Sequence, residues 1–331
     1  MTSATIHDLC ALDLQLETAP LPIRRFTHRM MVSHPTLAMK CATDQALEKY
    51  EGTERNQLTS PISITKLCEL FNIELVGTRP SSNRAWYSIE NYKPRNGHTG
   101  KLFFEAEKAF IKVADSVSYD TARISAAHEI GHLLIHRKGT KYDEATLRLP
   151  STPAEEALAE YGARLLLLPV CQPFKSTNLA EYALMHGSKA RVTLHASVSR
   201  LTDPDVVDVD IKGAILWRLN AQVEKLRPLS ARLTPQWHLC PRQFVPVRKC
   251  KARQGSLVAD LAESNRLVSD TRVEDVSIGS FIGRFRIDAC AWGSVDEGTR
   301  LVLSVFRSPH PSDKQREFDF NERFLETNQR Q

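Results

Sequence analysis

The chain is poor in long apolar runs and in paired cysteines. Among its 331 residues no run approaches the roughly 18 apolar residues needed to cross a bilayer. Its first residues lack the basic-then-apolar order of a secretory signal. The seven cysteines are scattered and form no Cys-x-x-Cys pair, so neither a disulfide framework nor a cysteine zinc site is indicated. We therefore expect a cytoplasmic protein with no membrane contact.

A large excess of charge is also lacking. The net charge of +5, from 44 basic and 39 acidic residues, is mild for this length and does not by itself indicate nucleic-acid binding. A basic stretch over 241–253 alternates with apolar residues, so a solvated strand face explains it better than phosphate contacts. With 42% hydrophobic residues, the composition is that of a soluble chain long enough for two or three domains.

The feature that carries chemistry is the pattern His-Glu-x-x-His at residues 128–132, in a stretch with helical periodicity. Residues four apart share one face of a helix, so the rings of His128 and His132 can point at one metal ion. Glu129 lies beside them, where a carboxylate can take a proton from water on the metal. The pattern predicts a zinc site with Glu129 as the catalytic base. The alternative is a partly buried helix that carries two histidines by chance.

The residues around His-Glu-x-x-His support a zinc site rather than a chance pair of histidines. Asp120 or Thr121 can cap the helix, and a short strand at 109–114 precedes it. We expect this strand to offer the substrate a backbone edge, as proteases often do. Two histidines leave zinc short of its usual three protein ligands. The metzincin extension would need glycine and histidine where Ile135 and Lys138 stand, so that branch is excluded.

A second helix, expected to follow Thr152, supplies a third ligand. Thr152 is a good cap, and Glu155 three residues later completes a capping box. Glu156 shares a face with Ala159 and Ala163, whose small side chains allow close approach to the first helix. We predict that Glu156 is the third zinc ligand; a solvated acidic face is the alternative.

Four other polar residues lie near these motifs. Glu160 either faces solvent or supports a ligand. His136 lies about 80° round the helix from His128, so packing suits it better than coordination. Tyr142 and Tyr161 are both candidates to stabilise an oxyanion, and the sequence does not rank them.

The run from 126 to 136, followed by the segment 156–169, resembles the ImmA/IrrE family of zinc-peptidase-like proteins. Two departures are visible: Gly162 stands where that family usually has an aromatic residue, and Glu160 where asparagine is common. The resemblance implies a minimal zincin-like domain whose substrate is a helix-turn-helix repressor of the Xre type. It also implies a GAF-like domain further along the chain.

The fold class we expect is α+β, with a zincin-like peptidase domain, a helical segment and a C-terminal α+β domain. The expected divisions are 1–57, partly disordered with a short helix near 44–50; 58–172, the peptidase domain; 173–210, helical; 211–310, the α+β domain; and 311–331, a polar tail.

The helical segment 173–210 contains two helices, with Gly187 and Ser188 as the expected turn, and suggests helix-turn-helix geometry. Packing against the peptidase core is the favoured explanation. If the segment binds DNA instead, Lys189, Arg191 and Arg200 would contact phosphates.

The sequence therefore predicts a zinc endopeptidase that cleaves a repressor in a stress or mobile-element response. The alternatives are a metal-dependent regulator that binds DNA or a repressor without cleavage, and a member of a toxin–antitoxin pair. The intact Glu129 favours the peptidase, because binding alone needs no general base.

Overall fold

The computed structural model divides the chain into two compact units. They are Met1–Cys171 with His186–Pro204, and Gln172–Met185 with Asp205–Gln331. The residues that the structure describes are 35–51, 61–75, 100–105, 108–113, 117–135, 153–169, 177–206, 210–219, 233–239, 252–264, 266–278, 281–295 and 299–309. Helices and two sheets within these ranges make the mixed α+β fold that the sequence predicted. No helix in the described ranges is long and apolar enough to span a membrane.

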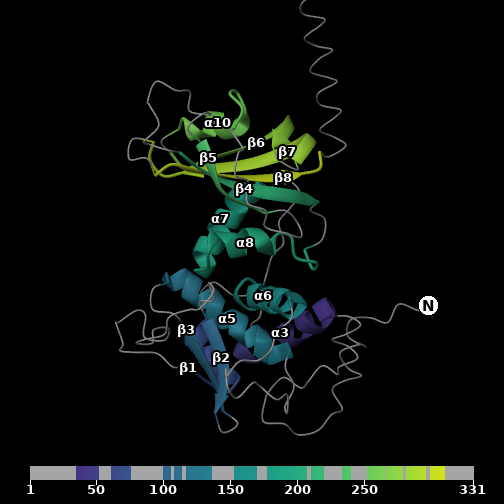
Figure 1. Ribbon diagram of the computed structural model, residues 1–331, viewed down its shortest axis with the longest axis vertical. Coiled ribbons are helices and arrows are strands. Elements are labelled where there is room, and N and C mark those ends of the chain that lie inside the picture. Colours follow the sequence, from purple (N-terminus) through teal and green to yellow (C-terminus); the bar gives the residue numbers. More distant parts are fainter. Residues whose placement is uncertain are drawn as a thin grey trace, which may run out of the picture. The chain divides into compact units, whose positions relative to one another are not determined.

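The first unit contains a small mixed sheet (Figure 1). β1 (Ile73–Leu75) runs parallel to β3 (Lys108–Val113), and β2 (Gly100–Glu105) runs antiparallel to β3 on its other side. Alternate residues of β3 are buried, as expected for a strand with one face on a core. The expectation that the strand over 109–114 forms the sheet edge is wrong, because β3 lies between β1 and β2, which are the edge strands of the described sheet.

The pattern His-Glu-x-x-His lies on α5 (Tyr119–Ile135), which packs against β2 and β3 (Figure 1). Its first turn is capped by Ser118, whose hydroxyl oxygen accepts the Thr121 backbone N–H at 3.2 Å. The cap is thus Ser118 rather than the expected Asp120 or Thr121, and the helix begins earlier than the apolar pattern suggested. Its core-facing residues are Ala122, Ala126, Ala127 and Ile130, all fully buried.

The second motif lies on α6 (Pro153–Leu167), which starts at the expected first position and packs along α5. Proline suits this position because its missing N–H would have no partner inside the helix. Thr152, the expected cap, lies outside the described residues. The leucines Leu165, Leu166 and Leu167 are buried, which fixes the C-terminal half of α6 in the core.

Two helices precede the sheet. α3 (Pro35–Glu51) is longer than the short helix expected near 44–50, and it packs against α6. Its residues Ala38, Met39 and Ala42 are fully buried, so this part of 1–57 belongs to the core. Cys41 on α3 is disulfide-bonded, which the scattered cysteines did not predict. α4 (Ile64–Leu70) follows, capped by Ser63.

Two more helices follow α6. α7 (Leu179–Ala190) runs through Gly187 and Ser188, so the expected turn there is wrong. The turn comes later, at Arg191 (φ 55°), and α8 (Leu194–Arg200) begins after it. A β-carbon on Gly187 would lie 2.9 Å from the Ser197 β-carbon, so glycine lets α8 pack tightly there.

The end of α8 is buried in the first unit. The side chain of Arg200 is 1% exposed and donates to the Leu168 carbonyl oxygen at 3.0 Å. Of the three predicted phosphate contacts, Lys189 and Arg191 are exposed and Arg200 is not. Burial of α8 from Ala196 to Arg200 agrees with the favoured explanation for this part of the segment, whereas residues 172–185, with most of α7, belong to the second unit.

The second unit is built on an antiparallel sheet of order β5-β4-β8-β7-β6 (Figure 1). The strands are β4 (Ile211–Leu219), β5 (Leu233–Leu239), β6 (Val268–Ile278), β7 (Phe281–Trp292) and β8 (Leu301–Arg307), and α10 (Leu257–Ala262) packs on β6, β7 and β8. Strand-like segments at 213–219, 280–286 and 299–306 and a helical segment at 258–263 predict β4, β7, β8 and α10, whereas the sequence did not indicate β5 or β6. A further strand-like segment, at 243–247, lies outside the described residues. The GAF-like assignment of this region stays a prediction.

A buried carboxylate organises one face of this sheet. Asp288 on β7 is fully buried, and its neighbours Ile287 and Ala289 face the α10 side. Its two oxygens accept from Arg307 Nη2 at 3.1 and 2.9 Å and from the Leu179 backbone N–H at 3.2 Å. Each charge is therefore paired, as buried charges must be to avoid a large desolvation cost.

Candidate metal centre

α5 turns two imidazole rings toward one point. His128 and His132 are four residues apart, and their Nε2 atoms lie 3.0 Å from one another. The rings meet edge to face, with centroids 4.7 Å apart and an interplanar angle of 81°. The side chain of His132 is 8% exposed and that of His128 is 20% exposed, so the site opens to solvent on the side of His128. The helical spacing predicted from the sequence is thus realised.

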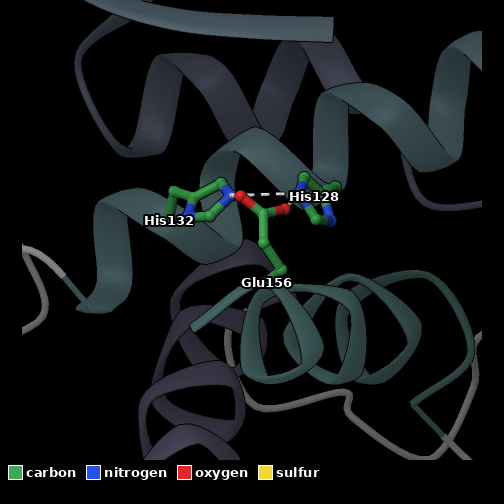
Figure 2. A group of neighbouring side chains, drawn as sticks. All are labelled: His128, His132 and Glu156. Carbon is green, nitrogen blue, oxygen red and sulfur yellow. Dashed lines mark hydrogen bonds and ion pairs between the residues drawn. The ribbon is translucent and has the colours of Figure 1, made fainter. Parts of the chain in front are cut away.

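The carboxylate of Glu156 comes from α6 and lies between the two rings (Figure 2). Its Oε2 is 3.1 Å from His128 Nε2, and its Oε1 is 3.4 Å from His132 Nε2. These three side chains are the one group in the described part of the chain with ligand atoms close enough to hold a metal ion. A shared cation would stabilise three electron-pair donors that converge in this way.

The spacing of the three donors fits a small tetrahedral ion. Zinc binds nitrogen and oxygen at about 2.0–2.1 Å, so two ligands of a tetrahedron lie about 3.3 Å apart. The observed separations of 3.0, 3.1 and 3.4 Å are close to that value. The donor set of two imidazoles and one carboxylate is also one that catalytic zinc sites use. The residues therefore fit a metal with an open coordination position.

Close helix contact brings Glu156 within reach of the histidines. Gly131 lies inside the motif, and a β-carbon there would lie 2.6 Å from the Ala159 carbonyl oxygen and 2.9 Å from its Cα. Backbone thus touches backbone where α5 crosses α6. The prediction that small residues allow this approach holds for Ala159, with Gly131 as the partner that the sequence reading did not single out.

A contact between α6 and α3 explains why Gly162 stands where the ImmA/IrrE family usually has an aromatic residue. A β-carbon on Gly162 would lie 2.7 Å from Met39 Sδ. Met39 is fully buried and clusters with Tyr161 and Leu165. The thioether from α3 therefore takes the space beside Gly162 where a larger side chain on α6 would otherwise lie.

Glu129 faces the sheet rather than α6. It is 9% exposed, and a β-carbon at Gly100 would lie 3.0 Å from its Oε1. The base predicted from the sequence therefore lies between the histidines of α5 and the edge strand β2. Gly100 was not among the residues that the sequence reading considered, since a lone glycine before a strand has no recognisable signature.

Two arginines bond the helices of the site to other segments: the half-buried Arg164 on α6 and the buried Arg123 on α5. Arg164 on α6 donates to Asp203 through Nε at 3.1 and 3.0 Å and through Nη2 at 2.6 Å. Arg200 also reaches Asp203, at 3.3 Å. Arg123 on α5 donates to the carbonyl oxygens of Arg191 at 2.9 Å and of Ile62 at 2.7 Å. Burial lowers the pKa of the Arg123 guanidinium from its ordinary value.

The other candidate residues lie apart from the metal group. The side chain of Glu160 is 63% exposed and 3.8 Å from Arg164, so it faces solvent. Tyr161 is 4% exposed in the cluster with Met39, and five residues after Glu156 it lies about 140° round α6. That position does not suit an oxyanion donor. Tyr142 and His136 lie outside the described residues.

A helix that carries His-Glu-x-x-His, a second helix that supplies a carboxylate and a small mixed sheet define a zincin-like domain. Residues 91–183 match the family model of the IrrE N-terminal-like domain, a peptidase family. This match confirms, over this part of the chain, the resemblance inferred from the sequence.

Other comparisons add little. No curated protein sequence matches the chain. Among solved structures, a Mycobacterium tuberculosis transcriptional regulator matches at 15% identity with a TM-score of 0.36, over 81% of this chain and 87% of that one. A likeness at this level carries no argument about fold or function.

Proposed function

We propose that this protein is a zinc-dependent endopeptidase and that its substrate is a helix-turn-helix repressor of the Xre type. The observation that carries the proposal is the convergence of His128, His132 and Glu156 within 3.0 to 3.4 Å, with Glu129 beside them. A site that only binds metal needs the three ligands but gains nothing from a carboxylate next to them. The peptidase family match over 91–183 points the same way.

In this proposal each residue has one task. His128, His132 and Glu156 would hold zinc, which when bound supplies Lewis-acid activation of water and of the scissile carbonyl. Glu129 accepts the proton from the attacking water and then donates it to the leaving amine. By analogy with other proteases, an extended substrate segment would pair with a strand near α5.

The substrate class rests on the resemblance to ImmA/IrrE proteins, and cleavage would release a stress or mobile-element response. The alternative is a metal-dependent regulator that binds DNA or a repressor without cleavage, or a toxin–antitoxin member. DNA binding by α7 and α8 is the weaker option, because Arg200 is 1% exposed and bonded to Leu168 and Asp203.

The test is to co-express the chain with the helix-turn-helix repressor encoded nearest to its gene and to search for a truncated repressor by mass spectrometry. Glu129→Gln keeps the side-chain volume and removes the base, so metal binding should persist while cleavage falls by about 10²–10⁴. Glu155→Gln is the matched control: it makes the same chemical change next to the proposed ligand Glu156 on α6, and this variant should cleave the repressor as the parent does.

One result would contradict catalysis. If Glu129→Gln relieves repression as well as the parent chain does, while the repressor stays intact, the protein acts by binding. A truncated repressor with the parent chain and none with Glu129→Gln would support the peptidase.

A further inference from the structure

Gly100 lies where the edge strand passes over the metal helix. It is the first residue of β2 and pairs with Val113 of β3, which is 1% exposed. Residues directly opposite one another in an antiparallel pair lie on the same face of a sheet. Any side chain at position 100 would therefore point into the space between the sheet and α5.

That space is already filled by the proposed base. A β-carbon at Gly100 would lie 3.0 Å from Glu129 Oε1, 3.2 Å from Glu129 Cγ and 3.3 Å from the Ser125 carbonyl oxygen. All three distances are shorter than most β-carbon contacts in proteins. A methyl group at position 100 therefore fits only if a neighbouring group moves by a few tenths of an ångström.

Backbone conformation does not account for the glycine. Within the described residues, the glycines with positive φ are Gly213, Gly255, Gly283 and Gly293. Gly100 is not among them, so an L-residue could adopt its backbone conformation. Glycine is needed at position 100 because the Glu129 side chain fills the volume that a β-carbon would occupy.

A larger residue at position 100 would move Glu129 rather than the helix. The Ser125 carbonyl belongs to the middle of α5, where the helical hydrogen-bond ladder holds it. The Glu129 carboxylate ends a flexible side chain and can rotate away at small cost. The substitution would therefore displace the base and leave the ligands on the α6 side of α5 in place.

We propose that Gly100 is a positioning residue: its missing side chain lets the edge strand press against Glu129 and fixes where the carboxylate lies. This inference rests on the proposed function in one respect, namely that Glu129 is the base of a peptidase. The contact between position 100 and Glu129 stands without it.

The kinetic test uses the zinc-loaded full chain, with the helix-turn-helix repressor encoded nearest to its gene as the probe. Gly100→Ala should lower kcat by about 10- to 100-fold, because displacements below 1 Å are costly in an oriented site. KM and the zinc stoichiometry should not change. Lys112→Ala, which faces away from the core on the neighbouring strand β3, should retain the parental kcat. An unchanged kcat for Gly100→Ala would overturn the proposal.

A second measurement needs no cleavage. The guanidinium unfolding midpoint is compared for Gly100→Ala in the parent chain and in a Glu129→Ala background, which lacks both side-chain atoms nearest to position 100. Gly100→Ala should lower the midpoint more in the parent than in the Glu129→Ala background, where only the contact with the Ser125 carbonyl oxygen remains. An equal shift in both would show that Gly100 serves another contact and would overturn the proposal. If the parent chain cleaves no repressor, the proposed function fails, and this comparison alone decides the role of Gly100.

Discussion

Gly131 and Ala159 bring the backbones of the two metal-site helices into contact. A β-carbon on Gly131 would lie 2.6 Å from the Ala159 carbonyl oxygen, which belongs to the backbone and cannot swing aside. Replacing a helical glycine by alanine normally stabilises a helix by about 1 kcal/mol. At Gly131 the steric conflict with Ala159 opposes that gain. Gly131 lies three residues after His128 and one before His132, so the conflict falls between the two proposed ligands.

The first prediction follows from this contact. Gly131→Ala should push α5 and α6 apart and weaken zinc binding by at least about tenfold, a typical cost of disturbing the support of a metal ligand. A chelator competition titration measures the affinity. Ala157→Ser, at an exposed position on α6, is the matched control and should bind zinc as the parent does. Parental affinity in Gly131→Ala would contradict the proposed importance of this contact.

The second prediction concerns the ligands. His128→Ala and His132→Ala should each abolish stoichiometric zinc binding, and Glu156→Ala should weaken it strongly, because the donors converge within 3.4 Å. Glu155→Ala should change helix stability by roughly 1 kcal/mol through its expected capping role and leave the metal in place. Metal analysis after dialysis distinguishes the variants. The opposite pattern for Glu155 and Glu156 would show that the wrong glutamate was chosen.

The third prediction concerns Met39 and Gly162. Gly162→Ala should destabilise the parent chain, because the new β-carbon would lie 2.7 Å from Met39 Sδ and overpacking costs about 1–3 kcal/mol. In a Met39→Ala background the same change should stabilise by up to about 1 kcal/mol, since the space is free and alanine favours a helix. Urea unfolding of the four chains gives the coupling. Additive effects would mean that the two residues do not compete for space.

The fourth prediction compares two ion pairs of Arg164. Asp203 has a side chain 4% exposed, and its removal leaves the half-buried Arg164 and the buried Arg200 without their carboxylate. Asp203→Ala should lower the free energy of unfolding by about 3–5 kcal/mol. Glu160→Ala removes the other partner, which is 63% exposed and 3.8 Å away, and should cost at most about 1 kcal/mol. Similar losses in denaturant titrations of the two variants would contradict the distinction.

The fifth prediction uses thiol chemistry. Burial raises the pKa of Cys68 to about 12 and that of Cys290 to about 11. A thiol whose pKa is raised is neutral near pH 8 and reacts slowly, because the thiolate is the nucleophile. Neither residue should be alkylated by iodoacetamide in the folded chain, and both should be alkylated after unfolding in guanidinium. Peptide mapping by mass spectrometry provides the measurement.

The grouping of the two histidines with Glu156 could be predicted from the sequence because it depends on local rules. Helical periodicity fixes which side chains share a face, so His128 and His132 could be paired without a structure. Proline at position 153 set the phase of α6 and so separated Glu156 from Glu155. These inferences involve residues only a few positions apart along one helix.

Contacts between distant segments could not be predicted in this way. Nothing near Met39 indicates that it fills the space beside Gly162, and nothing near Gly100 indicates a neighbour on α5. The turn expected at Gly187 failed because tight packing against Ser197 requires a glycine there inside a continuous helix. Strand β6 carries many charged residues and lacks the apolar alternation of a typical strand, since it lies at an edge of its sheet.

The two helices of the candidate centre are joined by more than packing. Since His128 and His132 come from α5 and Glu156 from α6, a bound ion would act as a cross-link between two helices that are separated in the sequence by residues 136–152. An ion that binds only the folded chain adds about 2.7 kcal/mol of stability at a free concentration 100 times its Kd. The lifetime of the folded protein would then follow the supply of free zinc around it.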